Sequence, residues 1–445
     1  MHSFRRARIP LASLPADFAR SMDPLRRHFE PWVECDLTVA GDRIVAVERA
    51  RAAHDASAST DLGGNLVFPG FVDVHTHLDK CHTWHRAPNP TGEFWDAIEV
   101  LHQDTKNWSA DDVRTRAEFG LRQAWSHGTV ALRTHLDSNS EVGRLSHEIM
   151  ADLRREWAGR ITLQTVSLAS LAAFTGGESK PVMATAAQYG ASALGGFPQP
   201  NPDLPAQLDY LLAAARELGI GVDLHVDESG LAYAECLRAT AEAVLRNAFP
   251  HPVACGHCCS LAVHDAARAT STIDLVKQAG ISVIALPLCN QYLQDRGRSP
   301  SAPGAPRGIK RTPFWRGLTL AHELIEAGVP FACASDNVRD AFYAWGDFDA
   351  LEVLRQSIRI GHLDTRLDYA PAVVTRTAAD IMGLADTGRI APGARADLVV
   401  TSTPTFNAFL ARPSAARRLI HGESFRAGAY PDFNDLPASV RPQHA

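Results

Sequence analysis

The chain has 445 residues, of which 45% are hydrophobic and 21% are charged, and its formal net charge at pH 7 is −6. The charge is small and dispersed, which argues against a nucleic-acid-binding protein with a basic face, and no apolar run is long enough to span a bilayer. The eight cysteines lie mostly within apolar runs, which indicates reduced, buried thiols and a cytoplasmic protein.

The order of the elements along the chain predicts an α/β fold. Apolar, strand-like runs alternate with helical patterns, which is typical of βαβ units and a parallel sheet. The first clear helix begins with a Ser109-x-x-Asp112 cap and reaches Trp125. Eight candidate strands lie at residues 67–77, 129–135, 161–168, 193–197, 221–226, 253–257, 282–287 and 330–336. Eight strands with intervening helices predict a (β/α)8 TIM barrel.

Short strand candidates also flank the barrel, at residues 35–39, 43–47, 396–400 and 418–422. Neither flank is large enough to bury a core alone, so we expect the N- and C-terminal segments to form a small β-sandwich together. The expected division is a sandwich subdomain of residues 1–66 and 391–445 and a catalytic barrel of residues 67–390. A run rich in proline and glycine, residues 299–308, is either a mobile loop over the barrel mouth or a surface linker.

The most informative short motif is His75-Thr76-His77, at the end of the first barrel strand. Alternation in a strand turns residues i and i+2 to the same face, so the two imidazoles point the same way. Neutral imidazole is a good ligand for Zn²⁺ or Fe²⁺, and this pair is therefore a candidate half of a metal site.

The ends of other strands carry residues of the same chemistry. A lone buried histidine is usually a core residue with a hydrogen-bond partner, but a set in barrel order indicates a site, because barrel enzymes place their chemistry at the C-terminal strand ends. The set consists of His135 and Asp137 on the second strand, His225 on the fifth, His257 on the sixth and Asp336 on the eighth.

These segments together resemble the amidohydrolase superfamily, and more closely its cytosine deaminase-like branch. The resemblance runs from about residue 35 to residue 425, through segments 69–79, 133–137, 163–166, 225–228, 256–257, 287–294, 335–337 and 388–400. It implies a hydrolase that acts on C–N bonds in cyclic amidines, built on the barrel and sandwich described above.

The resemblance also implies the roles of individual residues. One divalent metal ion, zinc or iron, would activate a water molecule that attacks the amidine carbon and releases ammonia. Glu228 would transfer a proton from this water to the substrate ring, and His257 would polarise or orient the attacked centre. Asp336 would relay a second proton to the leaving ammonia. The metal ligands would be His75, His77, His225 and Asp336.

A second metal ion is not expected. Two-metal branches of the superfamily usually carry a bridging carboxylated lysine on the fourth strand, and the fourth strand here has none. The nearest lysine, Lys180, precedes Pro181 in an expected loop.

Four residues are expected to contact the substrate. Gln164, at the end of the third strand, matches the family's substrate-binding glutamine, although a purely structural hydrogen bond is the alternative. Asn337 stands where cytosine deaminases carry a second acid, and Phe342 stands where they carry a tryptophan. Lys80 replaces a small polar residue and could contact a carbonyl or anionic group, or could pair with a neighbouring acid such as Asp79.

The sequence therefore predicts a metal-dependent hydrolytic deaminase of an amino-substituted N-heterocycle, either a cytosine-like pyrimidine or a related aminoazine. Two alternatives stay open within the enzyme class: ring-opening hydrolysis of a cyclic amide, and removal of an alkylamino group from a triazine. A non-catalytic barrel scaffold is a third, although such scaffolds typically lose metal ligands. The expected partner is a small heterocyclic substrate, with no nucleic acid or membrane, and a homo-oligomer is expected.

Overall fold

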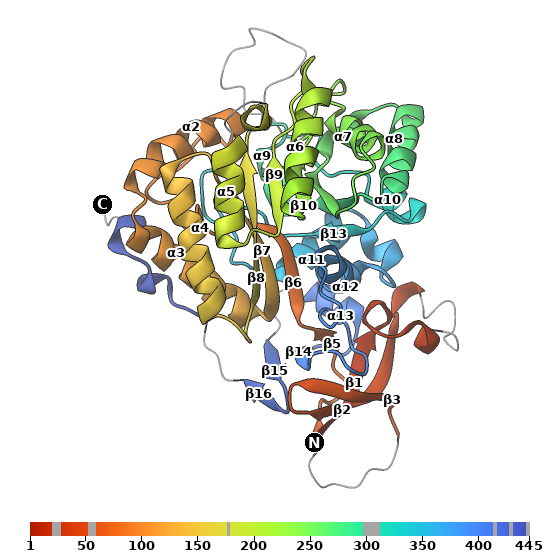
Figure 1. Cartoon of the computed structure of the whole chain (residues 1–445). Helices are drawn as coiled ribbons and strands as arrows, with labels where there is room; N and C mark the ends of the chain where they lie inside the picture. Colours follow the sequence, from red (N-terminus) through yellow and green to blue (C-terminus); the bar gives the residue numbers. More distant parts are fainter. Residues whose placement is uncertain are drawn as a thin grey trace. The chain divides into compact units, whose positions relative to one another are not determined.

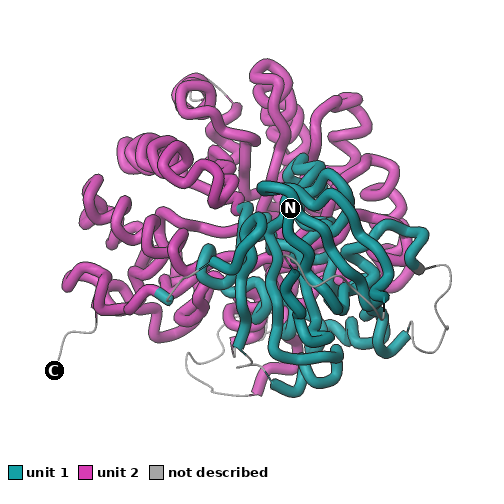
Figure 2. Tube along the Cα trace, turned by 90° about the horizontal axis from the view of Figure 1, so that it is seen from below, with its two compact units in different colours: residues 1–74, 124–131, 349–430 teal, residues 75–123, 132–348, 431–445 magenta. Residues whose placement is uncertain are grey.

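The computed structural model describes residues 1–19, 28–51, 59–175, 179–296, 312–412, 416–426 and 430–441. The proline- and glycine-rich run at 299–308 lies outside these described residues. The chain forms two compact units, which Figure 2 shows in different colours. One unit comprises residues 1–74, 124–131 and 349–430, and the other comprises residues 75–123, 132–348 and 431–445.

Eight parallel strands form the predicted barrel, and they follow one another in the sheet in chain order. Between its first and last strands, the backbone N–H of Asp336 donates to the carbonyl of His75 at 3.0 Å, and Thr76 Oγ1 donates to the Asp336 carbonyl at 2.7 Å. The strands are β6 (Phe71–Thr76), β7 (Thr129–Asp137), β8 (Thr162–Ala169), β9 (Ala193–Gly196), β10 (Gly221–Val226), β11 (Val253–His257), β12 (Ser282–Ala285) and β13 (Phe331–Cys333).

Helices connect these strands and lie outside them (Figure 1). Strands covered in this way are buried on both faces, which explains their almost continuous apolar runs. No helix among the described residues is long and apolar enough to cross a membrane. The helices are α2 (Phe94–Asp104), α3 (Ala110–His127), α4 (Glu141–Glu156), α5 (Ser179–Tyr189), α6 (Leu204–Leu218), α7 (Cys236–Arg246), α8 (Ala266–Gln278), α9 (Pro287–Leu293) and α10 (Ala321–Ala327).

The N- and C-terminal segments form the expected β-sandwich. One sheet has the order β3-β2-β1-β4, and the other has the order β16-β15-β14-β5. Alternate residues of both sheets form one buried cluster, which includes Phe4, Leu37, Leu398 and Ile420. The strands are β1 (His2–Pro10), β2 (Trp32–Ala40), β3 (Arg43–Arg49), β4 (Ser59–Asp61), β5 (Val67–Pro69), β14 (Asp397–Thr401), β15 (Arg417–His421) and β16 (Ser424–Arg426).

The run at 67–77, expected as one strand, is two strands in the structure. Gly70 separates β5, which pairs with β14 in the sandwich, from β6, which belongs to the barrel. A Cβ atom at Gly70 would lie only 2.7 Å from Val130 Cγ2 and 3.1 Å from Asp397 Cβ, so glycine is needed where the chain passes from one sheet to the other.

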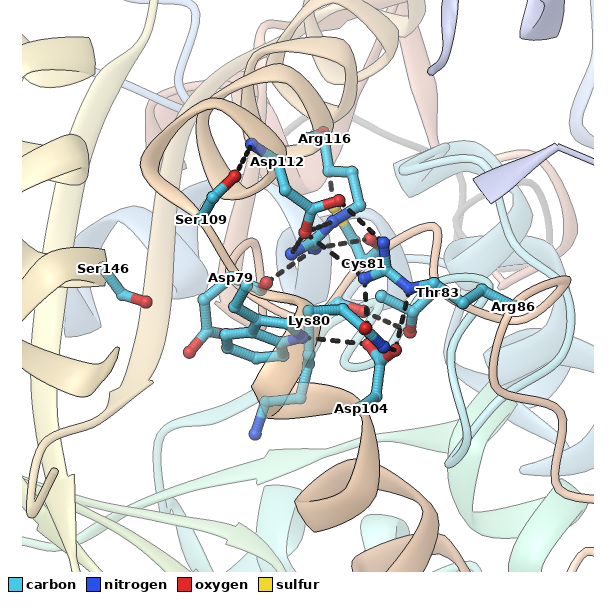
Figure 3. A network of polar contacts seen from close by, with 12 residues as sticks. Asp79, Lys80, Cys81, Thr83, Arg86, Asp104, Ser109, Asp112, Arg116 and Ser146 are labelled. Carbon is cyan, nitrogen blue, oxygen red and sulfur yellow. Dashed lines mark hydrogen bonds and ion pairs between the residues drawn. The ribbon is translucent and has the colours of Figure 1, made fainter. Parts of the chain in front are cut away.

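The segment that follows β6 is held by a buried arginine (Figure 3). Arg116 of α3 donates from Nη1 to the backbone carbonyls of Asp79 and Cys81 at 2.7 and 2.9 Å. Its Nε and Nη2 donate to Asp112 Oδ2, one turn earlier on the same helix, at 3.0 and 2.8 Å. Because Arg116 is fully buried, these hydrogen bonds satisfy a charge that water does not reach.

A second arginine extends the network (Figure 3). Arg86 donates from Nε to Asp104 and from Nη1 to Asp112, both at 2.7 Å. Burial raises the pKa of both carboxyls, but the hydrogen bonds from arginine outweigh it, and the net shift is downward. Their contribution to stability is therefore present at neutral pH and is lost as the pH falls through the lowered pKa of each group in the folded protein.

We expect Arg116→Met to destabilise the protein by about 3 kcal/mol, because it removes one partner of a buried ion pair and leaves two backbone carbonyls unpaired. Asp112 keeps its bond to Arg86, which limits the loss. Arg114→Met on the same helix is the matched control, because Arg114 and its partner Glu156 are 35% and 47% exposed, and should cost less than about 1 kcal/mol. Urea unfolding measures both, and equal effects would show that the network does not stabilise the fold.

Candidate active site

The predicted metal ligands lie at the C-terminal ends of three barrel strands. His75 is the fifth residue of β6, and His77 follows that strand directly. His225 is the fifth residue of β10. Asp336 lies three residues after β13, at the point where this segment meets the end of β6. The closure of the barrel therefore brings residues from opposite ends of the sheet order to one place.

The four side chains converge on one point inside the barrel unit. His225 Nε2 lies 3.2 Å from His75 Nε2 and 3.2 Å from His77 Nε2. Asp336 Oδ1 lies 3.3 Å from His77 Nε2 and 3.7 Å from His75 Nε2. All four residues are buried, with the exposed fraction at most 8%.

This arrangement fits a divalent metal ion. Bonds of about 2.0–2.1 Å in tetrahedral geometry hold ligand atoms about 3.3–3.4 Å apart, close to the separations observed. Burial and the neighbouring histidines hold the pKa of His75 and His225 well below the usual value, so both imidazoles are in the neutral, ligating form. Among the described residues, neither carboxylate oxygen of Asp336 has a hydrogen-bond partner, as expected for a group that binds a cation.

A triad of polar side chains lies beside the ligands. Asn290, on α9, donates from Nδ2 to Glu228 Oε1 at 3.1 Å, and the same nitrogen lies 2.9 Å from His257 Nδ1. Because Asn290 Nδ2 is a donor, His257 Nδ1 must accept, which leaves the imidazole proton on Nε2. Burial lowers the pKa of His257 to about 4, so the ring is neutral at pH 7. Burial, followed by the charge of Asp336, raises the pKa of Glu228 well above its usual value.

No sequence motif assigns Asn290 a role of its own. The residue lies in the matched segment 287–294, but an amide is not a typical metal ligand or proton-transfer group. Its position depends on α9, which begins at Pro287 immediately after β12 and turns Asn290 toward Glu228 and His257.

The backbone is strained at this end of the barrel. Asp227, His257 and Asp336 have φ angles of 51°, 67° and 64°, in the left-handed region that non-glycine residues rarely occupy. Such conformations cost on the order of 1–3 kcal/mol each and cluster at functional sites. Asp227 is held in place by its own carboxylate, which accepts from the backbone N–H groups of Cys236 and Leu237 at the start of α7.

A second group of candidate ligands surrounds His135, which stacks on His75 with ring centroids 4.0 Å apart. The third member, Asp223, already pairs with Arg133 Nη1 at 2.9 Å. The positive charge of Arg133 disfavours the binding of a metal ion beside Asp223. Strand β9, Ala193–Gly196, carries no lysine. Lys180, expected in a loop, lies instead in the first turn of α5. The geometry thus favours one ion over two.

The expected position of Gln164 at the end of its strand is wrong. It is the third of the eight residues of β8, far from the C-terminal end, and its side chain is only partly buried. Gln164 Oε1 accepts from Arg133 Nε and Nη2 at 3.0 and 2.8 Å, so it belongs to the network of Arg133 and Asp223. Its role in substrate binding stays a prediction.

The other three expected substrate contacts lie close to one another. Lys80 is buried and donates to Asp137 Oδ2 at 2.9 Å, and its Nζ lies 5.8 Å from the centre of the Phe342 ring. Burial lowers the pKa of Lys80, but Asp137 and Asp79 outweigh it, so the net shift is upward and the amine is charged. Asn337 donates to Asp340 Oδ2 at 2.7 Å, which ties it to its own loop.

A cavity of about 640 Å³ opens over His225 and Glu228. Its walls come from the start of α2 and from the segments after β9, β10 and β12. Several aromatic side chains line it, including Phe94, Phe197 and Trp315. A cavity of this size lies within the range of small-molecule sites. The fold and the ligand cluster thus define a metal-dependent barrel hydrolase.

Comparisons with known proteins identify the family. The amidohydrolase family matches residues 99–424, more than half of the chain. A protein named pterin deaminase, from Rhizobium rhizogenes, is 46% identical over 412 residues, which cover 92% of each chain. N-isopropylammelide isopropyl amidohydrolase from a Pseudomonas species is 26% identical and covers 83% of this chain and 87% of its own. The crystal structure of 5-methylcytosine deaminase from Klebsiella pneumoniae, liganded with phosphonocytosine, has a TM-score of 0.80, 23% identity and coverage of 97% and 99%.

The chain therefore belongs to the amidohydrolase family, as the sequence motifs predicted. It is a metal-dependent hydrolase that acts on carbon–nitrogen bonds of a small heterocyclic molecule. The likeness to the solved structure supports the fold.

We expect His77→Ala and His225→Ala each to reduce bound metal to well below one equivalent, because each removes one of the four converging ligand atoms. His102→Ala is the control, since His102 is exposed on α2. Metal content of the purified proteins, measured by mass spectrometry, decides between the outcomes. Full metal content in both variants would mean that the ion binds elsewhere.

Proposed function

We propose that this amidohydrolase is a hydrolytic deaminase whose substrate is a pterin, that is, a fused pyrimidine–pyrazine ring with an amino group on an amidine carbon. The observation that carries the proposal is the convergence of four metal ligands beside Glu228 and His257, under a cavity lined by aromatic side chains. The choice of a pterin rests on the 46% identity to the pterin deaminase over 92% of both chains. A cavity of about 640 Å³ is large enough for such a bicyclic ring.

The metal ion would be held by His75, His77, His225 and Asp336, and zinc and iron(II) both suit this set of ligands. The chemistry that a divalent ion supplies at such a site is the acidification of water, which provides a nucleophile at neutral pH. The remaining steps belong to residues of the chain.

Glu228 would move the proton. In its carboxylate form it accepts a proton from the attacking water and passes it to the ring nitrogen beside the amidine carbon. His257 donates from Nε2 to the oxygen that develops charge on the attacked carbon. Asp336 accepts the second proton from the hydroxyl group on the attacked carbon and transfers it to the amino group, which leaves as ammonia while the carbon becomes a carbonyl. Asn290 fixes the side chains of Glu228 and His257 relative to each other, because it contacts both.

Phe342, Lys80 and Asn337 would shape the side of the site nearest α2. The Phe342 ring lies 5.9 Å from that of Phe94, which lines the cavity, so the two form an aromatic wall for a planar substrate. Lys80 Nζ lies 5.8 Å from the centre of the Phe342 ring, and we propose that it contacts a carbonyl of the substrate ring. Asn337 would shape the site indirectly, by fixing the conformation of its own loop, because its amide donates a hydrogen bond to Asp340.

The test is an ammonia-release assay on the protein with its metal content quantified. The panel contains a pterin, cytosine, an N-alkylammelide and a ring-opening substrate such as a cyclic imide. We expect the pterin to have the highest kcat/KM and its dioxo product to appear with one equivalent of ammonia. If release of an alkylamine from the triazine is the main activity, the result would favour the alternative function, removal of an alkylamino group from a triazine. The 26% identity to the ammelide amidohydrolase supports this alternative. A carboxylate product without ammonia would indicate ring opening and contradict deamination.

Glu228→Gln should retain the metal and lose about 10²- to 10⁴-fold in kcat, because the amide keeps the shape of the side chain but cannot carry the proton. Glu242→Gln, on an exposed position of α7, is the control. Steady-state kinetics and metal analysis on the same preparations measure the two effects separately. A variant with unchanged kcat would remove Glu228 from the mechanism.

Asn290→Ala should lower kcat by about 10- to 100-fold with a smaller change in KM, because hydrogen bonds to charged groups contribute about 1.5–3 kcal/mol. A positioning role predicts that the pH profile also changes, since Glu228 and His257 lose their common partner. Gln291→Ala, the next residue on α9, controls for damage to the helix. An unaltered pH profile with reduced stability would indicate a structural role only.

A further inference from the structure

The mouth of the cavity contains a rigidly held cation. Arg296 lines the cavity, and its Cζ lies 4.1 Å from the centre of the Tyr292 ring. The guanidinium group also lies close to Gly92, where an added Cβ would come within 2.7 Å of the same Cζ. Its Nε donates to the carbonyl of Tyr292. The guanidinium group is thus fixed between a ring and a backbone before any ligand arrives.

Arg296 forms no ion pair with a carboxylate in the part of the chain that the structure describes. Two acidic side chains of the cavity, Asp295 and Asp227, have backbone partners. Asp295 accepts from the backbone N–H groups of Phe314 and Trp315 at 2.6 and 3.1 Å, and Asp227 accepts from the start of α7. A planar, exposed guanidinium that has no carboxylate partner among the described residues is a suitable site for a carboxylate, which it can bind through two parallel hydrogen bonds.

Exposed aromatic side chains accompany this cation. Trp95 and Tyr233 are 66% and 70% exposed, and both line the same cavity. Trp315 lies against Gly230, where an added Cβ would come within 2.8 Å of the ring, so glycine allows the indole to approach the wall closely. Exposed apolar surface gathered around one cavity mouth indicates a binding surface. Planar groups gain most from such a lining.

We propose that the cavity mouth is a second subsite, which binds a carboxylate carried by a substituent on the heterocycle, with Arg296 as its partner and Trp95 and Tyr233 along the substituent. This inference rests on the proposed deamination of the inner ring. A carboxylate fits better than a phosphate, because Glu93 in the same wall and the acids deeper in the cavity repel a dianion. The substituent would extend from the inner ring toward solvent, away from Glu228 and the metal ligands.

The test compares matched substrates on the metal-loaded protein: an unsubstituted pterin, a pterin with an aryl carboxylate substituent, its neutral carboxamide isostere, and the corresponding phosphate. We expect the carboxylate to exceed the carboxamide in kcat/KM by about 10- to 100-fold, the size of effect that hydrogen bonds to a charged group produce. Arg296→Met should bring this ratio close to one, and Arg296→Lys should restore only part of it. Arg316→Met, an exposed cation outside the cavity lining, should leave the ratio unchanged.

The outcomes separate the subsite from the reaction. If the unsubstituted pterin is deaminated but carboxylate and carboxamide are equal, the subsite is wrong and the deaminase stands. A ratio that survives in Arg296→Met, or falls equally in Arg316→Met, also overturns the assignment of Arg296. Preference for the phosphate would contradict the choice of a carboxylate. If no pterin is deaminated, the proposed function fails, and the subsite fails with it.

Discussion

The closure of the barrel between the end of β6 and Asp336 is the contact on which the site depends. The backbone of Asp336 bonds to His75, and Thr76 bonds back to the Asp336 carbonyl, so the first and last strands are joined beside the metal ligands. This junction places the Asp336 carboxylate 3.3 Å from His77, although the two residues are 259 positions apart in the chain numbering (336 − 77). A barrel that stayed open at this junction would keep every ligand residue and lose the site.

The site concentrates costs that the surrounding structure has to offset. Four buried ligands, three left-handed non-glycine residues and a buried glutamate are each unfavourable alone. Their convergence becomes favourable where a cation neutralises Asp336 and uses the lone pairs of the imidazoles. Rigid supports lie immediately outside: Asp227 caps α7, and Asn290 joins Glu228 to His257. The surrounding structure therefore holds together polar side chains that would otherwise separate or be hydrated.

The sequence predicted much of this arrangement, and its failures have identifiable causes. Barrel strands such as β10 and β11 are short, mostly apolar runs with a histidine as the last residue or the one before it, and their expected bounds match the structure. Strand β1 was not recognised, because Arg5, Arg6 and Arg8 hide its alternation and a bulge between Phe4 and Ala7 interrupts it. The predicted position of Gln164 at the end of its strand was wrong for another reason. A match to a local motif does not fix how far along a strand a residue lies.

What the sequence could not supply is the layer of contacts between the ligand cluster and the cavity. His75, His77 and Asp336 are recognisable because metal binding restricts the side chains that can serve. Asn290, Arg133 and Arg296 have no such restriction, and their roles follow only from which neighbour each one meets in three dimensions. Barrel enzymes keep their chemistry at the strand ends and vary their substrates through the loops. In this chain, the segment fixed by Arg116 after β6 and the residues around Arg296 are such loop regions, and they lie at the same end of the barrel as the ligands.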